Sequence, residues 1–215
     1  MRYSVRDLQA RLNALGFDAG GVDGIRGLKT DSARDRAISD LGVSYERELF
    51  HESGLHRIHW HWTAGAEGVI DLERRYYHYI YDDEGFVVKG MHDPEDNVGK
   101  LVPGQYAAHT LNANSGAIGT SIDAMAGARE VPFRWGTEPI REVQVQALVE
   151  HTAELCKRYW IPVSMWSTLS HAEVQPTLGI RQKWKWDITV LPGMTSVGDA
   201  VEIGDRLRSM VREAM

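Results

Sequence analysis

Apolar side chains recur at helical spacing in the first part of the chain. Ser4, a residue type that often caps helices, precedes such a run, and Gly16 follows it at the position of a C-terminal stop. After a loop rich in Asp and Gly, Thr30 is predicted to cap a second helix that ends at Gly42. The apolar positions of the two helices are Val5, Leu8, Leu12 and Leu15, then Ala33, Ala37, Ile38 and Leu41. We therefore predict a small all-helical module over residues 1–45.

From about residue 54 the apolar positions alternate with polar ones, as they do in strands. The first such segment, 57–63, has its three large apolar side chains on one face and His59, His61 and Thr63 on the other. Further strands are predicted at 76–81, 86–88 and 117–123, the first two as a hairpin, and helices at 69–75, 138–159 and 197–213.

The longest predicted helix opens at Glu138-Pro139, because proline is favoured in the first turn of a helix. Its inward positions are Ile140, Val143, Ala147, Leu148 and Leu155. Strands interspersed with helices favour the α/β class, with a mixed central sheet flanked by helices. We assign residues 46–215 to this second domain.

Composition narrows the class of protein. The chain has 215 residues, 43% hydrophobic and 25% charged, which suits one large or two unequal globular domains. Its net charge of -6 argues against nucleic acid as a partner, since that role usually needs a basic surface. The single cysteine excludes an internal disulfide framework. No apolar run approaches membrane-spanning length, and the N-terminus lacks the apolar core of a signal peptide, so we expect synthesis in the cytoplasm without membrane insertion.

Three separate segments carry the residue types of a hydrolytic metal site. His59 and His61 share one face of the first strand, so periodicity alone does not choose between them. His171, Lys185 and Asp187 add a second imidazole, an ammonium group and a carboxylate. Catalytic zinc sites typically use three protein ligands of these types and leave the fourth position to water. The combination predicts metal-assisted hydrolysis.

Five short motifs stand in order along the second domain. They are His61-Trp62-Thr63-Ala64-Gly65, Tyr77-His78, Ala108-His109 with Asn114 and Ile118-Gly119, His171-Ala172-Glu173, and Lys185-Trp186-Asp187. Together they resemble the type 2 family of zinc-dependent N-acetylmuramoyl-L-alanine amidases. That family shares its fold with peptidoglycan recognition proteins and with the amidase endolysins of certain phages. The resemblance covers residues 56–190.

The resemblance implies a Zn²⁺ ion held by His61, His171 and Asp187, and it selects His61 over His59, because the ligand of the first motif stands two residues before the threonine. It also implies a groove for peptidoglycan beside the metal. We expect His109 to shape the site or contact substrate, and Trp184 and Trp186 either to line a sugar-binding groove or to pack in the core. The gap between His171 and Lys185 is longer than the family usually has, and we expect an inserted loop at 175–183.

The resemblance further implies that Tyr77 and Lys185 carry the catalysis. Some branches have a catalytic glutamate after Ile-Gly-x, where this chain has Ser121. In the phage branch that also lacks this glutamate, the acid/base role belongs to the tyrosine before the hairpin histidine, which is Tyr77 here. Asp123 is the reserve candidate for that role.

The helical module resembles the peptidoglycan-binding domain of many cell-wall hydrolases. The matching positions are Leu8-Gln9, Leu12, Gly16, Val22-Asp23-Gly24, Gly27 and Thr30. The module departs from that pattern at Ala37 and Ile38, where the family has a Phe-Gln pair. The alternative is a helical cap that only packs on its neighbour.

These resemblances favour an amidase endolysin that cleaves the bond between N-acetylmuramic acid and L-alanine. Such an enzyme is made in the cytoplasm of a phage's host cell and acts on the cell wall after release, and we expect a monomer whose partner is peptidoglycan. A cytoplasmic muropeptide-recycling amidase is the first alternative. A non-catalytic peptidoglycan-recognition module is the second.

Overall fold

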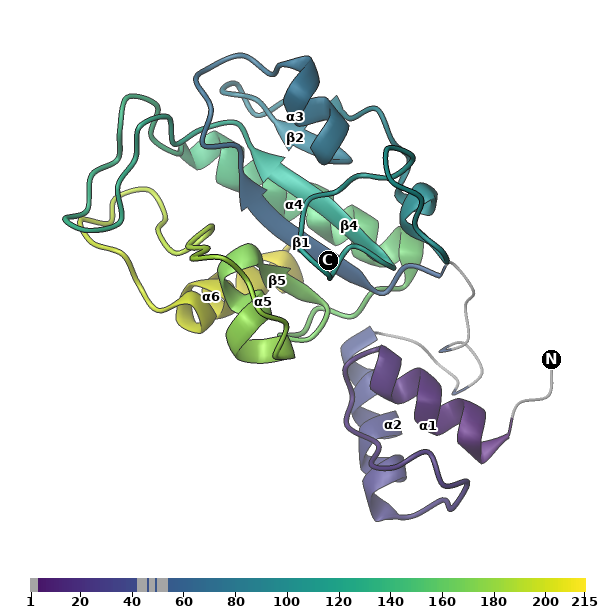
Figure 1. The fold of residues 1–215 in the computed structure, drawn as a ribbon. Coiled ribbons are helices and arrows are strands. Elements are labelled where there is room, and N and C mark those ends of the chain that lie inside the picture. The colour runs from purple at the N-terminus through teal and green to yellow at the C-terminus, as the bar shows by residue number, and fades with distance from the viewer. Residues whose placement is uncertain (1–3, 42–45, 47–48, 50–53) are drawn as a thin grey trace.

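The computed structural model describes residues 4–41, 46, 49 and 54–215, and Figure 1 shows a pair of helices beside a larger α/β domain. The pair consists of α1 (Val5–Ala14) and α2 (Leu28–Leu41). The Ser4 hydroxyl accepts from the Asp7 N–H at 3.2 Å, while the Asp7 carboxylate accepts from the Ser4 N–H at 2.8 Å. This capping box confirms the predicted helix start. The core of the module is Leu8, Leu12, Leu15, Phe17, Ala19, Ala33 and Ala37, and Leu49, from the range assigned to the second domain, packs with them.

Thr30 does not cap α2, contrary to the prediction, because the helix already begins at Leu28. The Thr30 side chain is buried, where its hydroxyl donates to the Ala19 carbonyl at 3.3 Å and accepts from Gln9 Nε2 at 3.3 Å. The hydroxyl therefore ties the loop and α1 to α2 instead of satisfying a helix end. The predicted stop at Gly42 lies outside the described residues.

A five-stranded mixed sheet forms the centre of the α/β domain, as predicted. Its strands are β1 (Arg57–Trp62), β2 (Tyr79–Tyr81), β3 (Val87–Lys89), β4 (Ala117–Ile122) and β5 (Thr168–Ser170). Their spatial order is β3-β2-β4-β1-β5. β1 lies in parallel between β4 and β5, β2 runs parallel to β4, and β3 pairs with β2 as the antiparallel half of the predicted hairpin.

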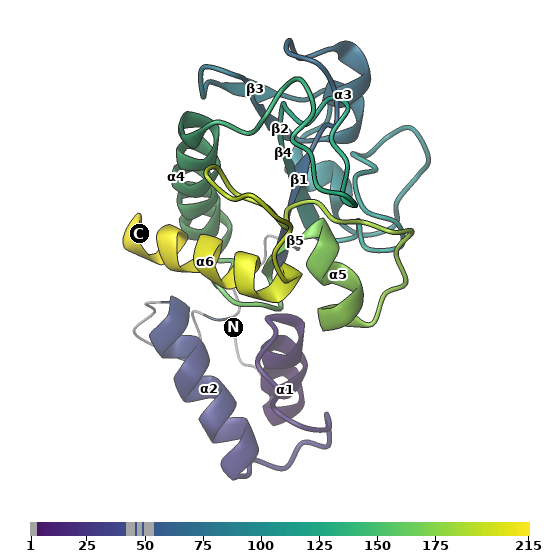
Figure 2. The ribbon, with the colours of Figure 1, turned by 90° about the vertical axis from the view of Figure 1, so that its left-hand side faces the viewer.

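Helices cover both faces of the sheet. They are α3 (Asp71–Tyr76), α4 (Glu142–Tyr159), α5 (His171–Leu178) and α6 (Ala200–Glu213), with a short 3-10 helix, η2 (Pro94–Asn97). Figure 2 shows α4 and α6 together on one side of the strands and α5 on the other. Ile58, Trp60 and Trp62 belong to the apolar core under α4, where Trp60 Nε1 donates to the Thr152 hydroxyl at 3.0 Å. The alternation of β1 therefore directs His61 to the opposite face.

The longest helix begins later than predicted, at Glu142 instead of Glu138-Pro139. The Glu138 carbonyl accepts from the Met125 N–H at 2.6 Å, so this stretch is bonded to the loop after β4. Val143, predicted to face inward, is exposed in the first turn of the helix, whereas Leu148 and Leu155 are buried as predicted. The buried apolar positions of α4 are Val145, Leu148, Val149, Ala153, Leu155, Cys156 and Tyr159.

The helical module contacts the α/β domain near the connection between α4 and β5. Trp160 packs against the module core. Gly16 has a φ of +87°, and a Cβ added there would lie 2.3 Å from Trp166 Cβ, so a residue without a side chain is needed at this contact. Within the described part of the chain, no helix is long and apolar enough to cross a membrane.

Candidate metal centre

Two histidines meet at the carboxyl ends of β1 and β5. The two strands are parallel with Trp60 opposite Ser170, so the next residue along each strand brings His61 and His171 side by side. Their ring centroids lie 4.7 Å apart, and both side chains are buried. The carboxyl ends of parallel strands are where α/β sheets commonly place their ligand sites.

Asp187 completes a three-residue cluster with these histidines. Its Oδ2 lies 3.1 Å from His61 Nδ1 and 3.2 Å from His171 Nδ1. The Asp187 carbonyl accepts from the Ala172 N–H at 2.7 Å, which fixes the loop to the first turn of α5. One potential ligand atom from each of the three residues lies within 4.8 Å of the others, and all three residues are buried. The cluster could therefore hold a metal ion.

The ionisation states of the cluster suit a metal. Burial lowers the pKa of His61 to about 4, and the neighbouring His171 adds to this effect, so the His61 ring is neutral at physiological pH. Burial opposes ionisation of Asp187, but the adjacent imidazoles, His171 first, hold its pKa below the ordinary value. Metal binding needs a neutral imidazole and an ionised carboxylate.

Tyr77 stands next to His61, with 5.2 Å between the ring centroids. The residue follows α3 directly in an extended conformation, so it lies at the junction between the helix and β2. Burial, and then the negative charge of Asp187, raises the pKa of Tyr77 above its ordinary value. The hydroxyl therefore keeps its proton at neutral pH.

The segment between α5 and Asp187 borders a cavity of about 390 Å³. Its lining residues are Ala172, Gln175, Pro176, Arg181, Gln182, Lys183, Trp184 and Lys185. Trp184 is 97% exposed, whereas Trp186 packs edge-on against Trp62 with 4.6 Å between ring centroids. The inserted loop expected at 175–183 is helical as far as Leu178, where α5 ends. Of the two predicted tryptophans, Trp184 is therefore the one that presents its ring to solvent.

His59 and His109 pack behind His61. Their rings lie edge-on to one another, 5.5 Å apart, and His109 lies 5.4 Å from His61. His109 is buried, with Nε2 at 3.3 Å from the Ala117 carbonyl and Nδ1 at 2.9 Å from the Thr110 hydroxyl. The metal cluster includes His61 and not His59, as the motif indicated. Contact between His109 and substrate stays a prediction.

Asp123, the reserve candidate, holds the loop that follows β1. Its Oδ1 accepts from the Thr63 hydroxyl at 3.1 Å, and its Oδ2 accepts from the Gly68 N–H at 3.0 Å. Burial raises its pKa. Ser121, which replaces the glutamate of other branches, pairs with His61 in the register of β4 and β1.

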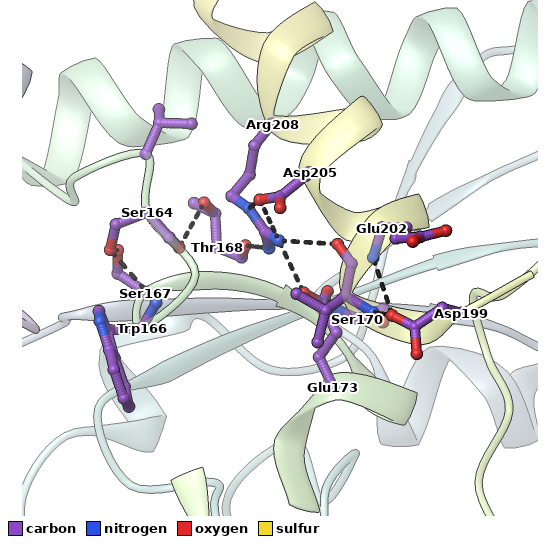
Figure 3. Close-up of polar contacts among 12 residues, drawn as sticks. Ser164, Trp166, Ser167, Thr168, Ser170, Glu173, Asp199, Glu202, Asp205 and Arg208 are labelled. Atoms are coloured by element: carbon purple, nitrogen blue, oxygen red, sulfur yellow. Dashed lines mark hydrogen bonds and ion pairs between the residues drawn. The ribbon is translucent and has the colours of Figure 1, made fainter. Parts of the chain in front are cut away.

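A buried ion pair braces the junction between β5 and α5, immediately before His171 (Figure 3). Arg208 of α6 donates to Glu173 Oε1 and to the Thr168 carbonyl, each at 2.8 Å. Glu173 Oε2 in turn accepts from the Ser170 N–H at 2.7 Å. This pair, which we call the Arg208–Glu173 clamp, joins α6 to the strand end and to the helix that carries His171.

Two polar residues outside the predicted set contact the far side of the histidines. The Thr110 hydroxyl lies 3.3 Å from His61 Nε2, and Gln182 Oε1 lies 3.0 Å from His171 Nε2. The sequence offers little signal for either. Thr110 directly follows His109 of the third motif, and Gln182 falls in the stretch expected to be an insertion.

A buried His-His-Asp cluster at the carboxyl edge of a mixed sheet could hold a metal ion and could serve a hydrolase of the α/β class. A family model narrows this class: the one for N-acetylmuramoyl-L-alanine amidase matches residues 51–188. The chain belongs to the N-acetylmuramoyl-L-alanine amidase family, and peptidoglycan is the substrate of that family. The match confirms the family resemblance and leaves α1 and α2 outside it. No curated protein matches this chain.

Proposed function

We propose that this protein is a zinc-dependent endolysin that hydrolyses the amide bond between N-acetylmuramic acid and L-alanine in peptidoglycan. The observation that carries the proposal is the buried cluster of His61, His171 and Asp187. Two imidazole nitrogens and a carboxylate oxygen form a ligand set that catalytic zinc sites use. Three protein ligands leave a fourth position for water, as hydrolysis requires.

In the proposed mechanism, His61, His171 and Asp187 would hold the zinc ion, which would supply a Lewis acid able to lower the pKa of a water molecule to about 7 and to polarise the scissile carbonyl. Lys185 places a positive charge beside the carbonyl oxygen as that oxygen becomes negative. Loss of one such group costs roughly two to three orders of magnitude in turnover. The Tyr77 hydroxyl relays the proton released by the attacking water to the leaving amine of L-alanine.

The surroundings of the cluster support a peptide-bearing, anionic substrate. Arg181, Lys183 and Lys185 line one cavity, and the stem peptides of peptidoglycan carry carboxylates. The exposed ring of Trp184 offers a face on which a sugar can stack. We further propose that the α1–α2 module attaches the enzyme to the wall of the host cell, and that the enzyme acts there as a monomer after release.

The test compares the wild-type protein with His171→Ala on purified peptidoglycan sacculi, with zinc content assayed for each. We expect the zinc-loaded wild type alone to reduce turbidity, with new N-terminal L-alanine and no new reducing sugar ends. Clearing with new reducing ends would instead identify a glycosidase and contradict the proposal.

The same experiment separates the two alternatives. A zinc-replete wild type that leaves sacculi intact but cleaves soluble muropeptides would be a recycling amidase. A wild type that binds sacculi but does not retain zinc would be a recognition module.

A further inference from the structure

We infer that Thr110 and Gln182 are positioning residues that fix the tautomers of the two histidine ligands. Each holds the Nε2–H of one ring, Thr110 on His61 and Gln182 on His171, so that both Nδ1 lone pairs face Asp187. The inference rests on the proposed metal site and adds the residues that orient its ligands. Partners of this kind fix the ring orientation of metal-bound histidines.

The hydrogen-bond network around Thr110 leaves one consistent arrangement of protons. His109 Nε2 lies 3.3 Å from the Ala117 carbonyl, which can only accept, so Nε2 carries the proton. A ring that carries its one proton on Nε2 has its acceptor at Nδ1. The Thr110 hydroxyl, 2.9 Å away, therefore donates its only proton to His109 Nδ1. Its oxygen then accepts from His61 Nε2–H at 3.3 Å and from His59 Nδ1–H at 3.1 Å.

The opposite arrangement fails at its shortest contact. If Thr110 gave its proton to His61 Nε2, the hydroxyl oxygen and His109 Nδ1 would face each other at 2.9 Å without a hydrogen between them. That contact is the shortest of the three around the hydroxyl. Two acceptors at this distance repel, so the network favours the Nε2–H tautomer of His61 and a bare Nδ1.

The contacts of Gln182 indicate in the same way which nitrogen of His171 carries the proton. Its amide nitrogen donates to the Leu111 carbonyl at 2.9 Å, so the amide oxygen is the atom that faces His171. That oxygen accepts from His171 Nε2–H at 3.0 Å. The Gln182 N–H donates to Gln175 Oε1 of α5 at 2.8 Å, which holds the side chain's own backbone in place.

One short segment thus orients both rings, because Thr110 reaches His61 directly and Leu111 reaches His171 through Gln182. The segment is itself anchored, since the Thr110 N–H donates to Asn114 Oδ1 at 2.7 Å. The result is a buried point on which three acceptors converge: two Nδ1 lone pairs and Asp187 Oδ2. Acceptors that face one another without a proton need a cation between them, which fits the metal proposed here.

The first test measures zinc affinity by competition with a chelator. We expect Thr110→Val and Gln182→Met each to weaken zinc binding about 10- to 100-fold, as for other orienting partners. Thr110→Ser keeps the hydroxyl and is the matched control, with affinity close to wild type. Unchanged affinity in both Thr110→Val and Gln182→Met would overturn the inference.

The second test assigns the tautomers in zinc-loaded protein from the imidazole nitrogen shifts in NMR spectra. We expect Nε2–H on both His61 and His171 in the wild type. In Gln182→Met, the Nε2–H resonance of His171 should shift because its acceptor is gone, while that of His61 stays unchanged. A zinc-loaded wild type without a proton on Nε2 of either ring would contradict the inference. The proposed function fails separately, if the wild type binds no zinc.

Discussion

At the scale of single residues, the surroundings of Tyr77 suit the role that we propose for its hydroxyl. Its ring packs beside His61, and its raised pKa keeps the hydroxyl protonated. Tyr77→Phe should keep the ring contact and remove only the proton relay. We expect kcat to fall by about 10²- to 10⁴-fold, the range for loss of a general acid or base, with zinc content unchanged. Steady-state kinetics on a soluble muropeptide, with zinc assayed in parallel, measures both quantities.

A second variant, at the neighbouring tyrosine, is the control for Tyr77→Phe. Tyr76, the preceding residue, is exposed, so Tyr76→Phe removes a tyrosine hydroxyl from the same turn without touching the cluster. It should retain wild-type turnover. Wild-type turnover in Tyr77→Phe would remove Tyr77 from the mechanism and return attention to Asp123.

Whether a residue of the site could be predicted from the sequence depends on its residue type. The clustering of His61, His171 and Asp187 could be predicted because these residues occupy motifs whose order the family preserves. Thr110 and Gln182 could not, since a threonine or glutamine becomes an orienting partner only through distances between loops. His59 and His61 lie on the same face of β1, so the alternation along the strand did not distinguish them, and the motif was needed to choose between them.

At the scale of elements, the Arg208–Glu173 clamp joins α6 to α5, and it depends on a glycine inside a helix. A Cβ at Gly204 of α6 would lie 2.2 Å from the Glu173 carboxylate, so only glycine allows this approach. Burial raises the pKa of Glu173, and Arg208 opposes that rise.

We expect Arg208→Met to destabilise the fold by about 3–5 kcal/mol, because it leaves a buried carboxylate without its partner. Arg206→Met, an exposed position two residues away on α6, is the matched control and should change stability by less than about 0.5 kcal/mol. Urea unfolding of the three proteins measures the difference. If Glu173→Gln combined with Arg208→Met is no more stable than Arg208→Met alone, the cost does not come from the unpaired carboxylate.

The elements themselves could be predicted where periodicity is long, as in β1 and β4, or where two short strands form a hairpin, as in β2 and β3. β1 and β4 each extend over six residues and were predicted close to their observed bounds. β5 has three residues, too few for an alternating pattern to be recognised. Its pairing with β1 nevertheless places His171 beside His61. The start of α4 was wrong because the Glu138 carbonyl is bonded to a distant loop, which no local propensity reports.

At the scale of the whole molecule, the free energy of unfolding should depend on pH, because the fold buries neutral histidines outside the His-His-Asp cluster. His78 accepts from the Gly119 N–H at Nδ1, 2.9 Å away, so Nε2 carries the proton that it donates to Asn97 Oδ1 at 3.1 Å. Burial lowers its pKa from 6.5 to about 4. A lowered histidine pKa means that the unfolded state binds the proton first. The stability contributed by neutral His78 is therefore complete above about pH 6.5 and is lost as the pH falls toward 4.

We expect the unfolding free energy to decline over this window by up to about 3 kcal/mol on account of His78. His78→Gln should be less stable at pH 7 but show a shallower decline. Urea unfolding from pH 7 to pH 4.5, with both proteins free of zinc, gives the slope of the unfolding free energy against pH for each protein. The other histidines are the same in both proteins, so the difference between the two slopes reports on His78. Equal slopes would mean that His78 does not resist protonation in the folded protein.

The order of the ligands along the chain has a consequence for synthesis. His171 and Asp187 are 16 residues apart, but His61 meets Asp187 across 126 residues. A ribosome has therefore made all five strands before the third residue of the cluster exists, and β1 waits for β5 to complete the sheet beside it. A chain that stops before Asp187 can form the sheet but lacks the carboxylate of the cluster, so any activity that needs the cluster starts only after the sheet is complete.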